Sequence, residues 1–204
     1  MKLYFTPGTC SLATHIVLRE LNLPFELMRV RLGAEPIVAA TRADYRQLNP
    51  NGYVPLLQLD DGQLLTEGAA ILSYLADLVP AHGLLPAGTA LERYEAQRWL
   101  VYISSELHKM FSPWLFHPEF GTQAAEVARG KIAKRLELIE RQLQGRAFLL
   151  GDTFTVVDAY LFTIASWSKP CGLSLDSFPL LAAYLQRIGE RNSVQSALRA
   201  EQGA

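Results

Sequence analysis

Residues 4–13 read YFTPGTCSLA, and this stretch decides how the first part of the chain folds. The apolar run Leu3–Phe5 predicts a short buried strand. The Pro-Gly pair that follows ends the strand, because proline offers no N–H to a sheet and glycine tolerates a turn. From Ser11 onward, apolar residues recur at helical spacing. Cys10 is therefore expected between the end of a strand and the first turn of a helix.

This position predicts that Cys10 is reactive. Unpaired backbone N–H groups and the positive end of the helix dipole favour a thiolate, which lowers the pKa expected for Cys10. The alternative is a small buried hydrophobe, which is the commonest role of a free cysteine. The third residue after Cys10 is Ala13, so the motif is not the Cys-x-x-Cys of a dithiol oxidoreductase. The second cysteine, Cys171, lies far away in sequence, which does not indicate a disulfide framework.

The composition excludes several classes of protein. The chain has 204 residues, of which 50% are hydrophobic and 19% are charged, so it can bury real cores and is not expected to be disordered. A net charge of −1 gives no electrostatic reason to bind nucleic acid or an anionic membrane. The sequence shows no signal-peptide pattern and no apolar run of membrane-spanning length. We expect a cytoplasmic protein whose partners include neither nucleic acid nor membrane.

The pattern of the first eighty residues predicts an α/β domain. A second strand at 25–32 follows the first helix and completes a βαβ unit with a right-handed crossover. A short helix is expected at 41–48. Two short strands around Asp60-Asp61-Gly62 form a predicted β-hairpin, and a third helix covers 69–78. The predicted order of elements over residues 1–80 is β-α-β-α-β-β-α.

The rest of the chain, residues 88–204, predicts an all-helical domain. Pro and Gly residues separate it from the first domain, and no convincing strand follows them. Apolar residues at helical spacing alternate with charged ones, as is typical of helices with one buried face. The expected helices include residues 91–115, 124–143, 179–187 and 194–200.

Two features of the first domain carry possible binding chemistry. Pro55 stands at the head of a strand, and a cis bond there would leave the backbone N–H and C=O of Val54 facing outward, ready to pair with an extended peptide. A simple strand-start proline is the alternative. Further on, Glu67 and Gly68 open a helix, whose N–H groups favour a carboxylate while the Glu67 side chain can pair with an ammonium. Compensation of the helix dipole by Glu67 is the other interpretation.

In the second domain the residues alone favour structural roles. His108 is a lone histidine inside a helix, which is more often structural than functional. Thr155 and Asp158 fit a capping box at a helix start, so Asp158 is interpreted as a structural residue and not as a catalytic acid. No spacing of His, Cys and carboxylate residues indicates a metal site.

Several motifs together resemble the cytosolic glutathione transferases: FTPGTCSL at 5–12, NPNGYVPLL at 49–57, LTEGAAI at 65–71 and FTVVDAYL at 154–161. Cys10 and the run Glu106-Leu107-His108-Lys109 are similar to the bacterial beta class. The resemblance covers essentially the whole chain. It implies a thioredoxin-like first domain, an all-helical second domain and a homodimer.

The resemblance also implies roles for individual residues, with glutathione as a cosubstrate and no cofactor. Cys10 would approach the glutathione sulfur, Val54 would pair with the cysteinyl backbone, and Glu67 with Gly68 would hold the γ-glutamyl end. In the second domain, His108 and Lys109 would face the cavity for the electrophile. Ser105 and Glu106 would reach the site of the partner subunit.

Three positions depart from the family pattern. Position 5 is Phe, so the phenol that activates glutathione in other classes is missing there, and Tyr4 should point to the opposite face of its strand. The loop Gly33–Pro36 lacks the lysine that beta-class enzymes place near the glycine carboxylate. Val101 stands where a relative has an asparagine that touches glutathione.

The sequence is thus interpreted as a glutathione transferase that adds the glutathione thiolate to hydrophobic electrophiles in a cleft between its domains. Thiol–disulfide exchange through Cys10 is a second reaction that can coexist with conjugation. The alternative from another class is a non-catalytic protein of the same fold, either a carrier of hydrophobic ligands or a regulator of a protein partner.

Overall fold

The structure is a computed structural model that describes residues 1–88 and 90–203, and the chain forms two compact units. The first unit consists of Met1–Gly83 together with the residues from Arg191 onward, and the second is Leu84–Glu190. This division differs from the sequence-based domains 1–80 and 88–204 at the C-terminal helix, which lies in the first unit. The physical reason is that this helix packs against the first helix of the chain.

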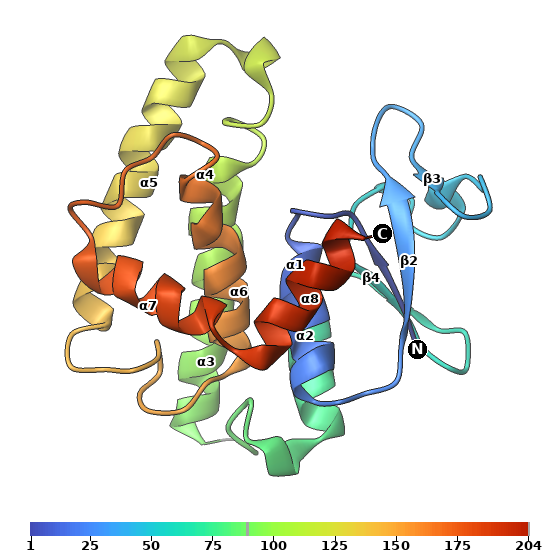
Figure 1. Ribbon diagram of the computed structural model, residues 1–204, viewed down its shortest axis with the longest axis horizontal. Coiled ribbons are helices and arrows are strands. Elements are labelled where there is room, and N and C mark those ends of the chain that lie inside the picture. Colours follow the sequence, from blue (N-terminus) through green and yellow to red (C-terminus); the bar gives the residue numbers. More distant parts are fainter. Residues whose placement is uncertain (89, 204) are drawn as a thin grey trace. The chain divides into compact units, whose positions relative to one another are not determined.

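A five-stranded mixed sheet forms the frame of the first unit, in the order β3-β2-β1-β4-β5 (Figure 1). Its two central pairs differ in direction: β1 runs parallel to β2 and antiparallel to β4. This is the thioredoxin-like arrangement that the sequence predicts. The strands are β1 (Lys2–Phe5), β2 (Glu26–Arg31), β3 (Ile37–Val38), β4 (Leu56–Gln58) and β5 (Leu64–Leu65).

The segment between β2 and β4 is less helical than the sequence suggests. The two-residue strand β3 was not expected, and it pairs antiparallel with the end of β2. Within the predicted helix 41–48, the structure has only one 3₁₀ turn, η1 (Tyr45–Gln47). The Asp44 carboxylate caps this turn by accepting from the backbone N–H of Arg46, and the fully buried Tyr45 ring anchors it.

The two faces of the sheet are covered by different elements. Helices α1 (Ser11–Glu20), α2 (Gly68–Leu78) and α8 (Asn192–Gln202) lie together on one face (Figure 1). Phe5 points to this face, with its ring centroid 6.2 Å from that of His15 on α1. Tyr4 points to the other face, where its ring lies 5.8 Å from that of Tyr45. The alternation predicted for Phe5 and Tyr4 is therefore confirmed.

The second unit is helical, as predicted. Helix α6 lies at its centre, and every one of its residues is buried, which explains its continuous apolar sequence. The remaining elements are α3 (Leu91–Tyr102), the π-helical segment η3 (Ile103–His108), α4 (Lys109–Phe111), α5 (Thr122–Gln142), α6 (Val156–Ala165) and α7 (Pro179–Gly189), with short 3₁₀ turns η4 (Pro118–Phe120) and η5 (Ser166–Ser168). A further 3₁₀ turn, η2 (Pro80–His82), closes the first unit.

The predicted helix 91–115 is interrupted in the structure. It passes from α3 into the π-helical turn η3 and ends at Phe111, shortly before Pro113. A proline disfavours helical geometry in the residue before it, which accounts for the end. Turns of π-helix inside α-helices are frequent at functional sites, and η3 carries Ser105, Glu106 and His108.

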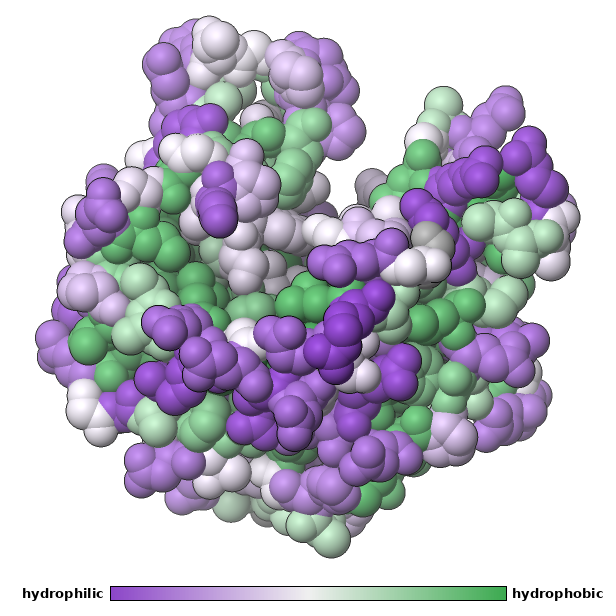
Figure 2. Space-filling view, viewed as in Figure 1, coloured by the Kyte–Doolittle hydropathy of each residue, from purple (hydrophilic) through white to green (hydrophobic). Residues whose placement is uncertain are grey.

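The surface is mixed in character. On the face shown in Figure 2, hydrophilic and hydrophobic residues are interspersed. No helix within residues 1–88 and 90–203 is long and apolar enough to cross a membrane.

Candidate functional site

Cys10 lies where the sequence places it, in the residue before α1 begins. The loop that leads to it is held by short-range hydrogen bonds. The carbonyl oxygen of Thr6 accepts from the Thr9 hydroxyl at 2.8 Å, and the backbone N–H of Thr6 donates to the Ser11 hydroxyl at 3.3 Å. Gly8 adopts φ +74°, a conformation that side chains rarely tolerate, so glycine is needed at this turn. The thiol is partly exposed.

The Cys10 thiol meets the backbone of Val54. Its sulfur donates to the Val54 carbonyl oxygen at 3.2 Å. The Val54–Pro55 peptide bond is cis, as one of the two interpretations of the sequence required. The bond to Val54 uses the thiol proton, so it favours the thiol, whereas the N–H groups at the start of α1 favour the thiolate. A ligand that takes over the Val54 carbonyl would remove the first effect and leave the second.

The start of α2 lies beside the same segment. A Cβ added at Gly68 would be 3.8 Å from Pro55 Cγ, so the first residue of α2 approaches the proline closely. Glu67, in the preceding position, is exposed and has φ +66° and ψ 108°. This is strained backbone for a residue with a side chain. The structure thus brings Cys10, Val54 and Gly68 to one region of the first unit and directs Glu67 to its surface.

His108 belongs to the second unit and sits among aromatic rings. Its Nδ1 lies 2.9 Å from the Tyr160 hydroxyl, and its ring centroid is 5.1 Å from that of Trp167. Phe116 packs edge-on against the same indole. Burial, with a smaller contribution from the Lys109 charge, lowers the pKa of His108 to about 4. The imidazole is therefore neutral at neutral pH and contributes to a largely apolar surface.

The neighbours of His108 on the same stretch are exposed. The Ser105 hydroxyl donates to the carbonyl oxygen of Val101 at 2.9 Å. The Glu106 carboxylate pairs with Arg135 of its own chain at 2.7 Å. Lys109 lies next to His108, and its charge acts on the imidazole. The reach of Ser105 and Glu106 to a partner subunit stays a prediction.

Asp158 has the structural role that the sequence predicts. Its carboxylate accepts from four donors: the Thr155 N–H and hydroxyl and the Leu149 N–H, each at 2.8 Å, and the Tyr184 hydroxyl, also at 2.8 Å. Burial raises the pKa of the Asp158 carboxyl, while these donors act in the opposite direction. The capping box at the start of α6 is confirmed.

Three residues near the predicted site were not identified from the sequence. Tyr160 is the partner of His108, and Glu201 of α8 reaches the loop before Cys10. Arg46 donates through Nη1 to the carbonyl oxygen of Ala34 at 2.7 Å, in the loop that lacks the beta-class lysine. Each depends on a contact between distant parts of the chain, and no local motif marks it. At the two other departures from the family pattern, Phe5 is buried and Val101 is exposed.

The described residues offer no metal site. Within 1–88 and 90–203, no group of three or more His, Cys, Asp or Glu side chains is arranged to hold a metal ion.

Comparisons with known proteins find matches in both parts of the chain. The family model "Glutathione S-transferase, N-terminal domain" matches residues 8–78, and "Glutathione S-transferase, C-terminal domain" matches residues 102–192. The chain is 44% identical to glutathione S-transferase GstA of Escherichia coli O157:H7 over 98% of each chain.

Solved structures give the same result. BphK, a bacterial GST in a ternary complex, is 50% identical, with a TM-score of 0.96 over 99% of this chain and 100% of that one. A sphingomonad glutathione S-transferase complexed with glutathione is 41% identical, with a TM-score of 0.94 over 100% of both chains. A beta-class glutathione S-transferase of Sphingomonas chungbukensis is 40% identical, with a TM-score of 0.94 over 98% of both.

Proposed function

Because this chain belongs to the glutathione S-transferase family and resembles its bacterial beta class, we propose that its first unit binds glutathione and that the enzyme transfers the glutathione thiolate to hydrophobic electrophiles. The single observation that carries the proposal is the contact between the Cys10 sulfur and the Val54 carbonyl oxygen beside the start of α2. These are the positions at which the resemblance places the peptide.

Each part of glutathione has a complementary group there. The backbone of Val54 would pair with the cysteinyl residue as an added strand. The N–H groups that open α2 at Gly68 are suited to the γ-glutamyl carboxylate, and the exposed Glu67 carboxylate to its ammonium. Glu67 keeps a strained backbone without making a cap hydrogen bond, which supports a ligand-binding role.

Arg46 is our candidate for the glycine carboxylate of glutathione. It is exposed, and its hydrogen bond to Ala34 places its guanidinium against the loop in which the lysine is missing. A guanidinium binds a carboxylate through two parallel N–H groups.

Replacing Arg46 by Ala should raise the KM for glutathione and leave the KM for the electrophile unchanged. Steady-state kinetics with each substrate varied in turn would measure both values.

Catalysis of conjugation at this site consists mostly of positioning the two substrates and stabilising the glutathione thiolate. This nucleophile is carried by the cosubstrate and not by the enzyme. The second unit would contribute apolar surface for the electrophile around His108, Tyr160 and Trp167. Because His108 is neutral, it can accept or donate a hydrogen bond there but does not act as a cation.

Cys10 adds a second reaction to the proposal. Its thiolate would attack the glutathione sulfur of a disulfide between glutathione and a second thiol, so that a mixed disulfide of Cys10 and glutathione forms and the second thiol leaves as a thiolate. A reduced glutathione thiolate would then attack the mixed disulfide, which regenerates Cys10 and releases oxidised glutathione. No second cysteine follows three residues later, so an external thiol has to complete the cycle.

The test combines titration and mass spectrometry. Isothermal titration should show heat on adding glutathione, whereas a non-catalytic carrier or regulator should show none. Incubation with oxidised glutathione should add one glutathione, removable by reduction, to the wild type and to Cys171→Ala. Cys10→Ala should gain none. An adduct that maps to the buried Cys171 would contradict the role of Cys10.

We also propose that the protein is a homodimer, supported by the exposed apolar side chains Leu91, Tyr94 and Val101 on α3. The cytoplasmic location expected from the sequence stays a prediction.

A further inference from the structure

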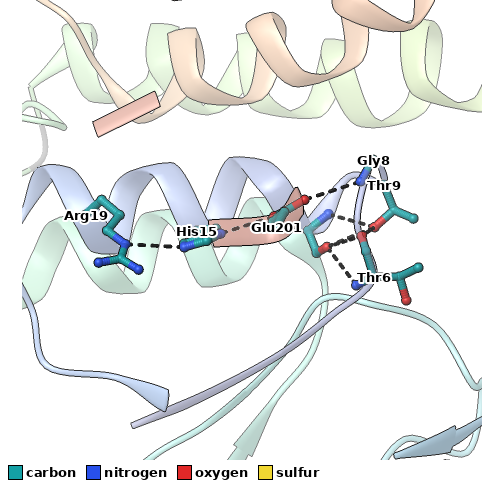
Figure 3. Close-up of polar contacts among 7 residues, drawn as sticks. Thr6, Gly8, Thr9, His15, Arg19 and Glu201 are labelled. Atoms are coloured by element: carbon teal, nitrogen blue, oxygen red, sulfur yellow. Dashed lines mark hydrogen bonds and ion pairs between the residues drawn. The ribbon is translucent and has the colours of Figure 1, made fainter. Parts of the chain in front are cut away.

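Helix α8 reaches back from the C-terminus of the chain to the loop that precedes Cys10. The side chain that makes this connection is Glu201, which is only 5% exposed. Its Oε2 accepts from the backbone N–H of Gly8 at 3.3 Å, and its Oε1 lies 3.1 Å from Nδ1 of the fully buried His15 (Figure 3). A carboxylate from residue 201 therefore contacts a backbone group two residues before the cysteine.

The same network sets the hydrogen-bond roles of the two ring nitrogens of His15. Arg19 donates from Nε to His15 Nε2 at 3.3 Å. A guanidinium can only donate, so Nε2 must be the unprotonated nitrogen of the imidazole. Nδ1 then carries the proton and donates it to Glu201. The His15 ring thus joins Arg19, whose guanidinium lies over the Phe25 ring at 5.0 Å, to Glu201.

The Cys10 loop combines these long-range contacts with its own short-range ones. Thr6, Thr9 and Ser11 tie the loop to itself. The contact from Glu201 ties it to a different helix, at the residue with the left-handed backbone. Figure 3 shows Glu201 between His15 on one side and Gly8 on the other, so a single carboxylate links α1, α8 and the loop.

We propose that Glu201 is a positioning residue for Cys10. By holding Gly8, it keeps the loop in the conformation in which the Cys10 sulfur points at the Val54 carbonyl. The inference rests on the proposed role of Cys10 and Val54 in the glutathione site. It implies that the last helix of the chain, α8, helps to position the Cys10 thiol. In the contacts described above, α8 touches neither Cys10 nor Val54.

Glu201→Gln is the variant that tests the proposal. The side chain keeps its size, but an amide has one acceptor oxygen and one donor nitrogen. The two donors that face residue 201, His15 Nδ1–H and Gly8 N–H, cannot both be satisfied. Losing one hydrogen bond that holds the loop should speed iodoacetamide alkylation of Cys10 by about fivefold and raise the KM for glutathione by a similar factor.

Glu20→Gln is the matched control. Glu20 also joins α1 to α8, because its carboxylate accepts from Arg191 and from the Ser193 hydroxyl. It does not contact the Cys10 loop. Both variants should lower the melting temperature, since both weaken the attachment of α8, but the alkylation rate of Cys10 in Glu20→Gln should stay within about twofold of the wild type.

Two measurements on the wild type keep the proposal testable if Glu201→Gln does not fold. The Gly8 amide should exchange slowly with solvent, and the nitrogen shifts of His15 should show a proton on Nδ1. A freely exchanging Gly8 amide would overturn the proposal, as would equal alkylation rates and equal KM values in the two variants.

These outcomes are separable from those that test the proposed function. Alkylation and amide exchange need no glutathione. If the protein bound no glutathione and Glu201→Gln still released Cys10, the proposed function would fail and the positioning role would stand.

Discussion

Glu67 holds a backbone conformation that residues other than glycine rarely adopt, with φ +66°. Such strain costs on the order of 1–3 kcal/mol. Glu67→Gly relieves it but gives the unfolded chain more freedom, about 0.5–1 kcal/mol in its favour. We expect Glu67→Gly to be as stable as the wild type or more stable, by up to about 2.5 kcal/mol, and to lose most of its affinity for glutathione. Denaturant unfolding and isothermal titration measure the two effects.

Glu67→Gln is the control for the charge. It keeps the strained backbone and the length of the side chain, so its stability should match that of the wild type. The charge-assisted bond to an ammonium contributes roughly 1.5–3 kcal/mol, so the affinity for glutathione should fall in this variant also. If Glu67→Gly were much less stable than the wild type and bound glutathione normally, Glu67 would be a scaffold residue.

His108 makes the stability depend on pH, because its folded pKa of about 4 lies below the ordinary histidine pKa of 6.5. Between these values the unfolded chain binds a proton that the folded chain excludes. The stability contributed by neutral His108 is therefore fully present above pH 6.5 and is lost as the pH falls toward 4, by up to about 3 kcal/mol. Denaturant unfolding at a series of pH values measures this loss.

His108→Gln should remove that component of the pH dependence. His117→Gln is the control, since His117 is an exposed histidine that pairs with Glu119 on the surface, and this variant should keep the slope of the wild type. In NMR spectra of the wild type, His108 should not titrate between pH 6 and 8. A titration midpoint near pH 6.5 would show that the His108 imidazole is hydrated and that burial does not control its pKa.

The residues that the sequence could identify are those whose chemistry is local. Cys10 before a helix and Val54 before a proline both stand in recognisable short patterns, and the structure brings the two together. Arg46 and Glu201 are different, because their positions depend on Ala34 and on Gly8, respectively. Nothing within a few residues of either indicates those contacts.

At the scale of elements, the errors of the sequence interpretation lie where tertiary contacts outweigh local propensity. Residues 41–48 contain good helix formers, yet Ile37 and Val38 pair with the end of β2 and leave room for only one 3₁₀ turn. By contrast, α5 was predicted as 124–143 and is observed as Thr122–Gln142. A long amphipathic pattern with one solvent-exposed face predicts a helix without knowledge of its tertiary contacts.

The start of α6 depends on one buried carboxylate. Asp158 accepts from Thr155, Leu149 and Tyr184, and an asparagine offers one acceptor oxygen in place of two. Asp158→Asn therefore leaves two buried donors facing an amide nitrogen. We expect a loss of about 2–4 kcal/mol in the free energy of unfolding, measured by denaturant unfolding.

Thr155→Val is the comparison for that loss. It removes the hydroxyl that donates to Asp158 and leaves the Thr155 N–H in place. The cost should be about 1 kcal/mol, the usual value of a helix cap. Glutathione affinity should be unchanged in both variants when they are folded. Equal losses of stability would mean that Asp158 acts through the cap alone and that its bonds to Leu149 and Tyr184 contribute little.

For the whole molecule, the sequence predicts the order of two domains but not the return of the chain to the first. Helix α8 is amphipathic like its neighbours, and only its contacts with α1 assign it to the first unit. The Glu20 carboxylate and Glu201 supply the polar part of those contacts. A fragment that ends after Leu85 would lack α8 and expose the face of α1 that it covers, so we expect such a fragment to aggregate.

The argument for a dimer also changes at this scale. The sequence shows a surplus of large apolar residues in the helical domain, but Trp99 and Trp167 are buried within their own unit. Trp114 and Phe116, which belong to the same surplus, are 37% and 42% exposed, and α3 adds three further exposed apolar side chains. On α3, Leu91 is 72% exposed, Tyr94 54% and Val101 59%, and their spacing places all three on one face of the helix. Exposed apolar side chains gathered on one helix face around an arginine, here Arg98, are typical of a protein–protein interface.

We therefore expect the wild type to sediment as a dimer at micromolar concentration and Tyr94→Glu to sediment as a monomer, because a carboxylate buried in the interface loses its hydration, which a pair with Arg98 one turn away on the same helix does not fully compensate. Val127→Glu is the matched control: Val127 on α5 is also 54% exposed but does not belong to the α3 face. That variant should remain dimeric. Dissociation in both variants would place the interface elsewhere or make it diffuse, and a monomeric wild type would contradict the dimer itself.

Because Ser105 and Glu106 follow α3 directly, loss of activity in Tyr94→Glu beyond any loss of stability would support their predicted reach to the partner's site.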